Sequence, residues 1–245
     1  MTGPLRVKPL RVNRLHYPVE SLGYGRRLGI WVQGCELACA GCVAQDTWPP
    51  TGGELVDVDQ LVWWWQRRYA GGADGLTVSG GEPLAQPEAV GALLAGVRRV
   101  SRDPDRPADI LVYTGYELAE LDPVQQRALS AADVVVTGRY RADLPTDLAL
   151  RGSGNQRLVL RTGLGRQRYA ELVDAPAASA PIQYHMDEHG VLGLVGIPRR
   201  GDLARLERGL RAGGATVGWA SWRPARRAGP AIAGPEPPAA DRRPR

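Results

Sequence analysis

Four apolar segments of this chain each run into glycine, and this pattern constrains the fold more than any other feature. The segments occupy residues 27–34, 74–81, 109–115 and 133–138. Helical patterns lie between them, at residues 57–70, 87–100 and 123–132. Strands that alternate with helices predict an α/β fold with a largely parallel sheet. Because ligands gather at the carboxyl ends of parallel strands, where glycine lets backbone approach them, we expect a binding site there.

The helical patterns also predict which side chains face the core. Spacings of three and four residues place two apolar sets on one face of their helices, namely Leu61, Val62, Trp65 and Tyr69 in the first and Val90, Leu93, Leu94 and Val97 in the second. Tryptophan occupies all of residues 63–65, and three consecutive side chains cannot share one face. We therefore expect one of these tryptophans at the surface.

The rest of the chain adds shorter elements. We expect a strand at 156–162, a hairpin from 182–186 to 191–198 with His185 and His189 near its solvated turn, a helix at 202–214 and a possible last strand at 215–222. This divides the chain into a lead-in at 1–19, a core at 20–165, an extension at 166–222 and a tail at 223–245. The tail has six prolines and no periodicity, so we expect it to be disordered.

The charge and composition limit the partners. The net charge is +5, but six arginines against Glu236 and Asp241 put +4 of it into the tail. The folded part therefore has no general basic character, and we do not expect nucleic acid as a partner. No apolar run is long enough for a membrane span or a signal peptide, which predicts a cytoplasmic protein with reduced thiols. Arg26 and Arg27 are expected to form a solvated charge pair.

All three cysteines of the chain lie within eight residues, in the segment WVQGCELACAGCVAQDTW. Cys35, Cys39 and Cys42 are too few for a zinc site, which takes four ligands. A fourth zinc ligand would have to come from elsewhere, and no spacing recommends the candidates His16, His185, His189 and Asp46. Three thiolates on an iron–sulfur cubane would instead leave one iron open to an added ligand. Three ordinary cytosolic cysteines are the remaining interpretation.

A second motif follows one helix later. The segment LTVSGGEPL presents Ser79, Gly80, Gly81 and Glu82 at the end of an expected strand. With the Cys-x3-Cys-x2-Cys spacing, this turn resembles the radical S-adenosylmethionine superfamily. The resemblance implies a partial, open βα barrel and a 4Fe–4S cluster held by the three cysteines. It also implies that S-adenosylmethionine binds the open iron and that the Gly-Gly-Glu turn receives its ammonium group.

Later motifs narrow the resemblance. In order, LVYTGYELAEL, DVVVTGRY and GSGNQRLVL make residues 20–162 similar to the activating proteins of glycyl-radical enzymes such as anaerobic ribonucleotide reductase. The resemblance implies that the nucleoside is also contacted by Thr114, Tyr116, Thr137, Ser153 and Asn155. Family members often carry an acid at position 137 and a serine at position 154, where this chain has threonine and glycine.

The same resemblance implies the activity and the partners. The reduced cluster would cleave S-adenosylmethionine to a 5′-deoxyadenosyl radical, which would take a hydrogen from a glycine of a glycyl-radical enzyme. The electron would come from a reductant such as flavodoxin or ferredoxin. Two alternatives stay open: a radical enzyme that modifies a peptide or small molecule, and a non-catalytic binding module stabilised by zinc or a cluster.

Overall fold

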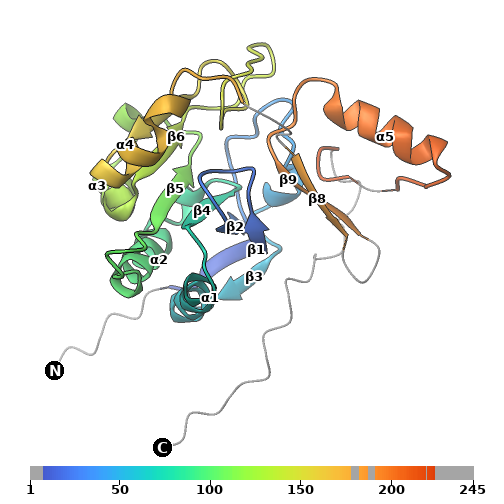
Figure 1. Ribbon diagram of the computed structural model, residues 1–245. Coiled ribbons are helices and arrows are strands. Elements are labelled where there is room, and N and C mark those ends of the chain that lie inside the picture. Colours follow the sequence, from blue (N-terminus) through green and yellow to red (C-terminus); the bar gives the residue numbers. More distant parts are fainter. Residues whose placement is uncertain (1–7, 178–181, 187–190, 219, 224–245) are drawn as a thin grey trace, which may run out of the picture.

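A seven-stranded sheet forms the centre of the molecule (Figure 1). The computed structural model describes residues 8–177, 182–186, 191–218 and 220–223. In spatial order the strands are β3 (Glu54–Val56), β1 (Leu10–Val19), β2 (Arg27–Val32), β4 (Gly75–Gly80), β5 (Asp109–Tyr113), β6 (Val134–Thr137) and β7 (Arg157–Leu160). β2, β4, β5 and β6 are parallel, whereas β1, β3 and β7 join through antiparallel pairings. The expected α/β fold with a mostly parallel sheet is confirmed.

Helices connect the parallel strands and cover one face of the sheet (Figure 1). They are α1 (Val58–Ala70), α2 (Pro87–Val100) and α3 (Pro123–Ala128). α4 (Gly163–Tyr169), after β7, lies on the opposite face, where Tyr169 packs with Leu111 and Val134. The predicted inner faces of α1 and α2 are buried and pack with alternate residues of the strands, such as Ile30, Val78 and Val112. Trp63 is the exposed tryptophan, with 41% of its surface accessible.

The opposite face of the sheet carries the hairpin of β8 (Ile182–Met186) and β9 (Leu192–Gly196). Val195 of β9 packs with Val19, Leu22 and Trp31, and its carbonyl accepts a 3.0 Å hydrogen bond from Ser21 Oγ. Because Trp31 and Ile30 are neighbours on one strand, they point to opposite faces. The hairpin therefore covers part of the face opposite α1, α2 and α3, and α4 covers another part of it.

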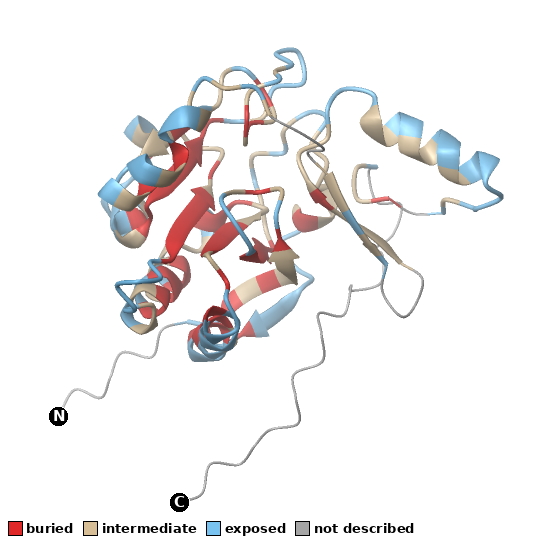
Figure 2. Ribbon diagram, viewed as in Figure 1, coloured by how far each residue is buried: buried red, intermediate tan, exposed pale blue. Residues whose placement is uncertain are grey.

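α5 (Asp202–Ala212) follows the hairpin and stands to one side of the sheet (Figure 1). Figure 2 shows that buried residues concentrate in the central strands, whereas α5 has none. The predicted hairpin and helix are thus present. The turn of the hairpin, with His189, lies outside the described residues, but His185 does not extend freely into solvent, because its ring stacks on His16 at 4.1 Å.

One local prediction is wrong and two strands, β1 and β3, are new. Residues 8–19 contain β1, a sheet strand that the sequence pattern did not predict. The possible strand at 215–222 is not formed in its described residues. There the backbone and side chain of Ser221 bind the cysteine loop, since its carbonyl accepts from Gln45 N at 2.9 Å and its hydroxyl donates to Val43 O at 2.9 Å. Apart from Arg223, the predicted tail lies outside the described residues.

Arg27 is not solvated, which corrects a further prediction. It lies fully buried at the amino end of β2 and makes a two-pronged ion pair with Asp109 at the amino end of β5, at 3.1 and 2.8 Å. Thr77 Oγ1, Tyr169 OH and Arg168 complete the network. A Cβ on Gly75 would overlap the Arg27 guanidinium, so glycine is needed at that position. The network ties α4 to the end of the sheet opposite the cysteines.

None of the helices in the described part of the chain combines the length and apolar character needed to cross a membrane.

Candidate functional site

The three cysteines lie on a loop that starts where β2 ends and is fixed at both ends. Gly34, with φ of 99°, turns the chain out of the sheet, and its amide donates to Thr47 O at 2.7 Å. Cys35 N donates to Trp48 O at 3.0 Å. Gly41, with φ of 78°, takes a left-handed conformation that residues with a Cβ rarely adopt. The loop is therefore held as a compact unit at the carboxyl ends of the strands.

All three thiols line one cavity of about 210 Å³. Ser79, Gly80, Gly81, Glu82 and Thr114 line the same cavity, so the structure brings the two sequence motifs together. Burial raises the pKa of the Cys35 and Cys42 thiols, with a smaller contribution from the neighbouring charge of Cys39. Bound iron would reverse this direction, because a nearby cation favours the thiolate.

The side chains around the cysteines distinguish the two metal sites that the sequence leaves open, zinc and an iron–sulfur cluster. Among the described residues, no group of three or more His, Cys, Asp or Glu side chains could hold one metal ion. Asp46 is paired with Arg14 at 2.6 Å, and His16 is stacked on His185. A cubane spreads its thiolates over separate iron atoms, so its ligands need not converge on one point. Three thiols around a glycine-rich cavity fit an iron–sulfur cluster better than zinc.

The Gly-Gly-Glu turn packs directly against the start of the cysteine loop. Gly81 N donates to Val32 O at 2.9 Å, and Glu82 N donates to Gly34 O at 2.9 Å. A Cβ on Gly80 would overlap the backbone of Val32, and one on Gly81 would overlap the oxygen of Gly34. Only glycine allows this approach, which sets the turn beside the thiols.

Glu82 is buried, and its carboxylate links the ends of β4 and β5. Oε1 accepts from Leu84 N and from Thr114 Oγ1, and Oε2 accepts from Gly115 N, each at 2.8 Å. Burial raises the pKa of Glu82, and these three donors act in the opposite direction. The carboxylate fixes the turn after β5 while it lines the cavity.

Four of the residues implied by the resemblance lie beside the cavity rather than on its wall. Thr137 is buried next to Gly138, which does line the cavity. Tyr116 N donates to Thr114 Oγ1 at 3.2 Å. Ser153 Oγ accepts from Arg141 N at 3.1 Å, and Asn155 Nδ2 donates to Arg139 O at 2.9 Å. None of these four residues lines the cavity in this structure.

Sequence reasoning missed several wall residues. Tyr113, Tyr140 and Gln156 line the cavity, and each lies inside or beside a quoted motif. Gln156 braces the loop before β7, since its side chain accepts from Gly152 N at 2.7 Å and donates to Gly138 O at 2.9 Å. Alternation along β5 could have placed Tyr113 on the face opposite Val112. Ile197 and Pro198 also line the cavity, although they lie more than 150 residues after Cys42 in the sequence. No local sequence signal indicates them.

Comparisons with known proteins agree with this geometry. A family model described as a 4Fe-4S single cluster domain matches residues 21–159. The anaerobic ribonucleoside-triphosphate reductase-activating protein of Haemophilus influenzae is 39% identical over 146 residues, covering 58% of this chain and 92% of that protein. The proteins of the same name from Vibrio cholerae and Enterobacteria phage T4 are 38% and 34% identical, covering 92% and 89% of their lengths.

A solved structure, that of QueE from Escherichia coli, aligns with 51% of this chain and 68% of its own. Its TM-score is 0.36 and its sequence identity 16%, which is too low to support an argument about fold or function. The family model ends before α4, so the hairpin and α5 lie beyond the matched region.

Proposed function

This chain belongs to the family of anaerobic ribonucleoside-triphosphate reductase-activating proteins and carries a 4Fe-4S single cluster domain, and from that membership we propose its reaction. It is a radical S-adenosylmethionine enzyme that installs a glycyl radical on an anaerobic ribonucleotide reductase. The observation that carries the proposal is the single cavity lined by three thiols and by the Gly-Gly-Glu turn.

Cys35, Cys39 and Cys42 are the residues that would hold the cluster. When bound, a cluster of this kind supplies the electron for reductive cleavage of S-adenosylmethionine, which yields methionine and a 5′-deoxyadenosyl radical. The described residues offer no fourth thiol, because the chain has only these three cysteines. One iron is therefore left for the substrate's own amino and carboxylate groups.

The Gly-Gly-Glu turn binds the methionine ammonium of this substrate. Glu82 accepts three hydrogen bonds from the chain, and a carboxylate can accept about four. The remaining capacity, with the carbonyl oxygens of the turn, suits a charged donor, and such charge-assisted hydrogen bonds are short and strong. Ser79 and Thr114 stand beside it as further polar contacts.

The other wall residues hold the substrate away from water. Leu37, Trp31 and Val43 give the cavity an apolar lining. A radical removes a hydrogen from whatever lies within reach, so exclusion of solvent and a fixed distance to one glycine are the main demands on the protein. The electron donor in this proposal is a flavodoxin or ferredoxin, and the protein works in the cytoplasm.

Anaerobic reconstitution with iron and sulfide tests the proposal. We expect about four irons per chain, 5′-deoxyadenosine on reduction with dithionite, and a glycyl-radical signal in electron paramagnetic resonance when the reductase is added. The triple Cys→Ser variant should bind no cluster. A protein that binds zinc, stays colourless and leaves S-adenosylmethionine intact would be a binding module, and the proposal would be wrong. Cleavage with no radical on the reductase would point to a peptide or small-molecule substrate.

A further inference from the structure

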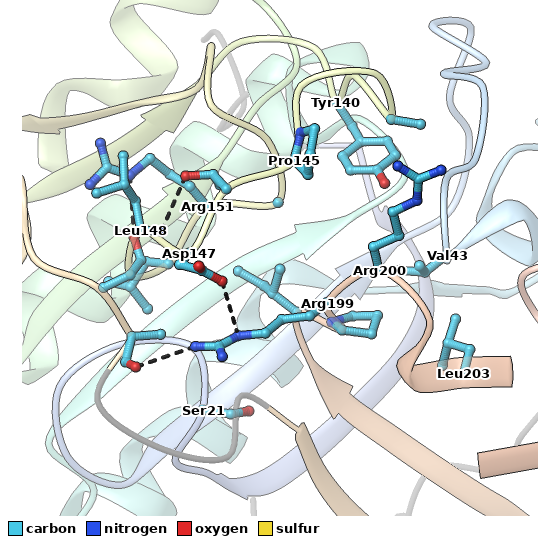
Figure 3. A pocket seen from close by; sticks show the side chains of 18 of the residues that line it. Ser21, Val43, Tyr140, Pro145, Asp147, Leu148, Arg151, Arg199, Arg200 and Leu203 are labelled. Carbon is cyan, nitrogen blue, oxygen red and sulfur yellow. Dashed lines mark hydrogen bonds and ion pairs between the residues drawn. The ribbon is translucent and has the colours of Figure 1, made fainter. Parts of the chain in front are cut away.

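A second, larger cavity of about 700 Å³ opens beside the cysteine cavity (Figure 3). One wall is the loop between β6 and β7, with Tyr140, Pro145 and Leu148. The other wall comes from the extension, through residues 197–204 around the start of α5. We call this cavity the access groove. Its volume falls in the range of ligand-binding clefts.

The access groove leads into the cysteine cavity. The two cavities share five lining residues, namely Val43, Tyr140, Gly152, Ile197 and Pro198. A segment that lies in the groove would therefore reach the place where the radical forms. Ile197 and Pro198 belong to the extension, so the region beyond the family match forms part of this junction.

The walls of the groove are fixed by contacts across it and by contacts within the extension. Arg199 of the extension pairs with Asp147 of the opposite loop at 3.6 Å, and Figure 3 shows this ion pair within the groove. Arg151 is buried and donates to the carbonyls of Leu172 and Val173. Glu207 binds Trp222 Nε1 at 3.0 Å and also pairs with Arg223. A groove that is held open in this way needs little reorganisation to bind a ligand.

The charges along the groove indicate the class of ligand. Arg151, Arg199 and Arg200 line it together with Glu20, Asp147 and Glu207, so cations and anions balance. Arg199 and Asp147 pair with each other, and Glu207 pairs with Arg223. Among the described residues, neither Arg200 nor Glu20 forms an ion pair. A neutral groove suits polypeptide backbone better than a polyanion.

The Tyr113 hydroxyl, a polar group without a hydrogen-bond partner among the described residues, lies at the inner end of the access groove, where the groove leads into the cysteine cavity. Tyr113 lines the cysteine cavity, and its hydroxyl oxygen is buried with no hydrogen-bond partner in the described structure. Its ring packs among apolar residues that include Trp31 and Ile197. Burial raises the pKa of Tyr113, so the hydroxyl stays protonated and able to donate. A buried hydroxyl without a partner is unfavourable, and a ligand carbonyl would supply the missing hydrogen bond.

We propose that the extension supplies one wall of the binding site for an extended, glycine-bearing segment of the reductase, with the Tyr113 hydroxyl donating to a backbone carbonyl of that segment. This inference rests on the proposed function, because it assigns the partner's position at the same site. The occupant is a polypeptide because the groove is neutral and continuous with the cavity in which a glycine must meet the radical.

Leu203 gives the sharpest test of the wall. It lines the groove from the first turn of α5, whereas Leu210 is similarly half-buried on the same helix but does not line the groove. In the reconstituted full chain, Leu203→Arg should raise the Kd for the reductase of the same organism at least tenfold, since it places a charge against the segment. Leu210→Arg should match the wild type in both Kd and 5′-deoxyadenosine formation. Equal Kd values for both variants, whether weakened or unchanged, would overturn the proposal.

Tyr113→Phe tests the inner end without altering the shape of the wall. We expect about tenfold less glycyl radical per 5′-deoxyadenosine formed, the effect of losing one buried hydrogen bond. An unchanged ratio would show that the hydroxyl does not bind the segment. Trp222 lines the groove just before the tail, so the tail is the competing occupant. Loss of the Leu203→Arg effect in a chain that ends at Arg223 would assign the groove to the tail and would also overturn the proposal.

Wild-type controls separate this inference from the proposed function. If the wild type forms no 5′-deoxyadenosine on reduction, the proposed function fails whatever the Kd values are. If it forms 5′-deoxyadenosine and a glycyl radical while Leu203→Arg behaves as Leu210→Arg, only the inference fails.

Discussion

The carboxylate of Glu82 does two jobs that one residue rarely combines. It holds the turn after β5 through three hydrogen bonds, and it lines the cavity as the anion beside the thiols. The first job follows from its position at the start of a short 3-10 helix, where a side-chain oxygen accepts from the free amide of Leu84. The second job follows from burial, which strengthens its attraction for a cationic ligand.

Glu82→Gln should lower the free energy of unfolding by about 1–3 kcal/mol, because the amide nitrogen of glutamine must face one of three donors. It should also weaken S-adenosylmethionine binding. Urea unfolding and equilibrium binding measure the two effects, with the exposed Glu88→Gln as control. Unchanged stability and affinity in Glu82→Gln would contradict both roles.

The pH dependence of stability gives a second readout of Glu82. Burial raises its pKa in the folded chain, so its contribution to stability is fully present below the unfolded pKa of about 4.3 and is lost as pH rises through the folded pKa. Glu82→Gln should remove this decline. A decline of equal size in the variant would assign it to another group.

The buried pair of Arg27 and Asp109 gives a prediction about stability. Burial alone would raise the pKa of Asp109, but the charge of Arg27 and the hydrogen bonds around the carboxylate lower it overall. This contribution to stability is therefore present above the unfolded pKa of about 3.9 and is lost as pH falls toward the folded pKa. Asp109→Asn leaves a buried cation unpaired and should cost about 3–5 kcal/mol. Asp143→Asn, in the exposed pair with Arg141, should change little in the same urea titration.

The helices and strands that the sequence predicted are those with a local pattern of apolar residues and glycine. α1 and α2 show their apolar faces at helical spacing, and the four parallel strands end in glycine, so both could be read from the sequence. β1 was missed because LRVNRLHYPV mixes arginine, asparagine and histidine with apolar residues, and most of it is only half-buried. Its place in the sheet depends on pairing with β2 and β3, which no local pattern records.

At the site, too, the sequence predicted residues in short motifs and missed those that depend on tertiary structure. The cysteines and the Gly-Gly-Glu turn were found because short spacings carry their chemistry. Tyr116 and Asn155, which the resemblance assigns to the nucleoside, are not among the residues that line the cavity in this structure. Tyr113 lines the cavity instead, because side chains alternate along β5.

The turn after β4 predicts a large effect from one methyl group. In Gly81→Ala the new Cβ would overlap Gly34 O, so the turn must move away from the cysteine loop. We expect iron bound per chain and S-adenosylmethionine affinity to fall severalfold. Gly209→Ala, in the middle of α5 with nothing near the added atom, should keep both and gain up to about 1 kcal/mol in stability. Equal iron content in the two variants would show that the turn is not held this tightly.

At the scale of the whole molecule, the hairpin of the extension packs on the face of the central sheet opposite α1, α2 and α3. α1, α2 and α3 cover one face of the sheet, and on the other face the buried residues Trp31 and Val19 pack with Val195 of β9. The hairpin forms its own two-stranded sheet and reaches the core through Val195, Gln183 and the stacked His16 and His185 rings. A small contact of this kind allows the hairpin to open while the seven-stranded sheet stays folded.

Val195→Ala tests whether the hairpin opens separately. The change removes apolar contacts with Leu22 and Trp31, which should lower the free energy of opening by about 1–2 kcal/mol. Hydrogen exchange of the β8 and β9 amides should then speed up by about tenfold, while the amides of β4 and β5 keep their rates. Tyr184→Ala, at an exposed position of β8, should leave both sets unchanged. If β4 and β5 speed up as much as the hairpin, the two sheets unfold together, and the wall of the access groove is as stable as the core that holds the cysteines.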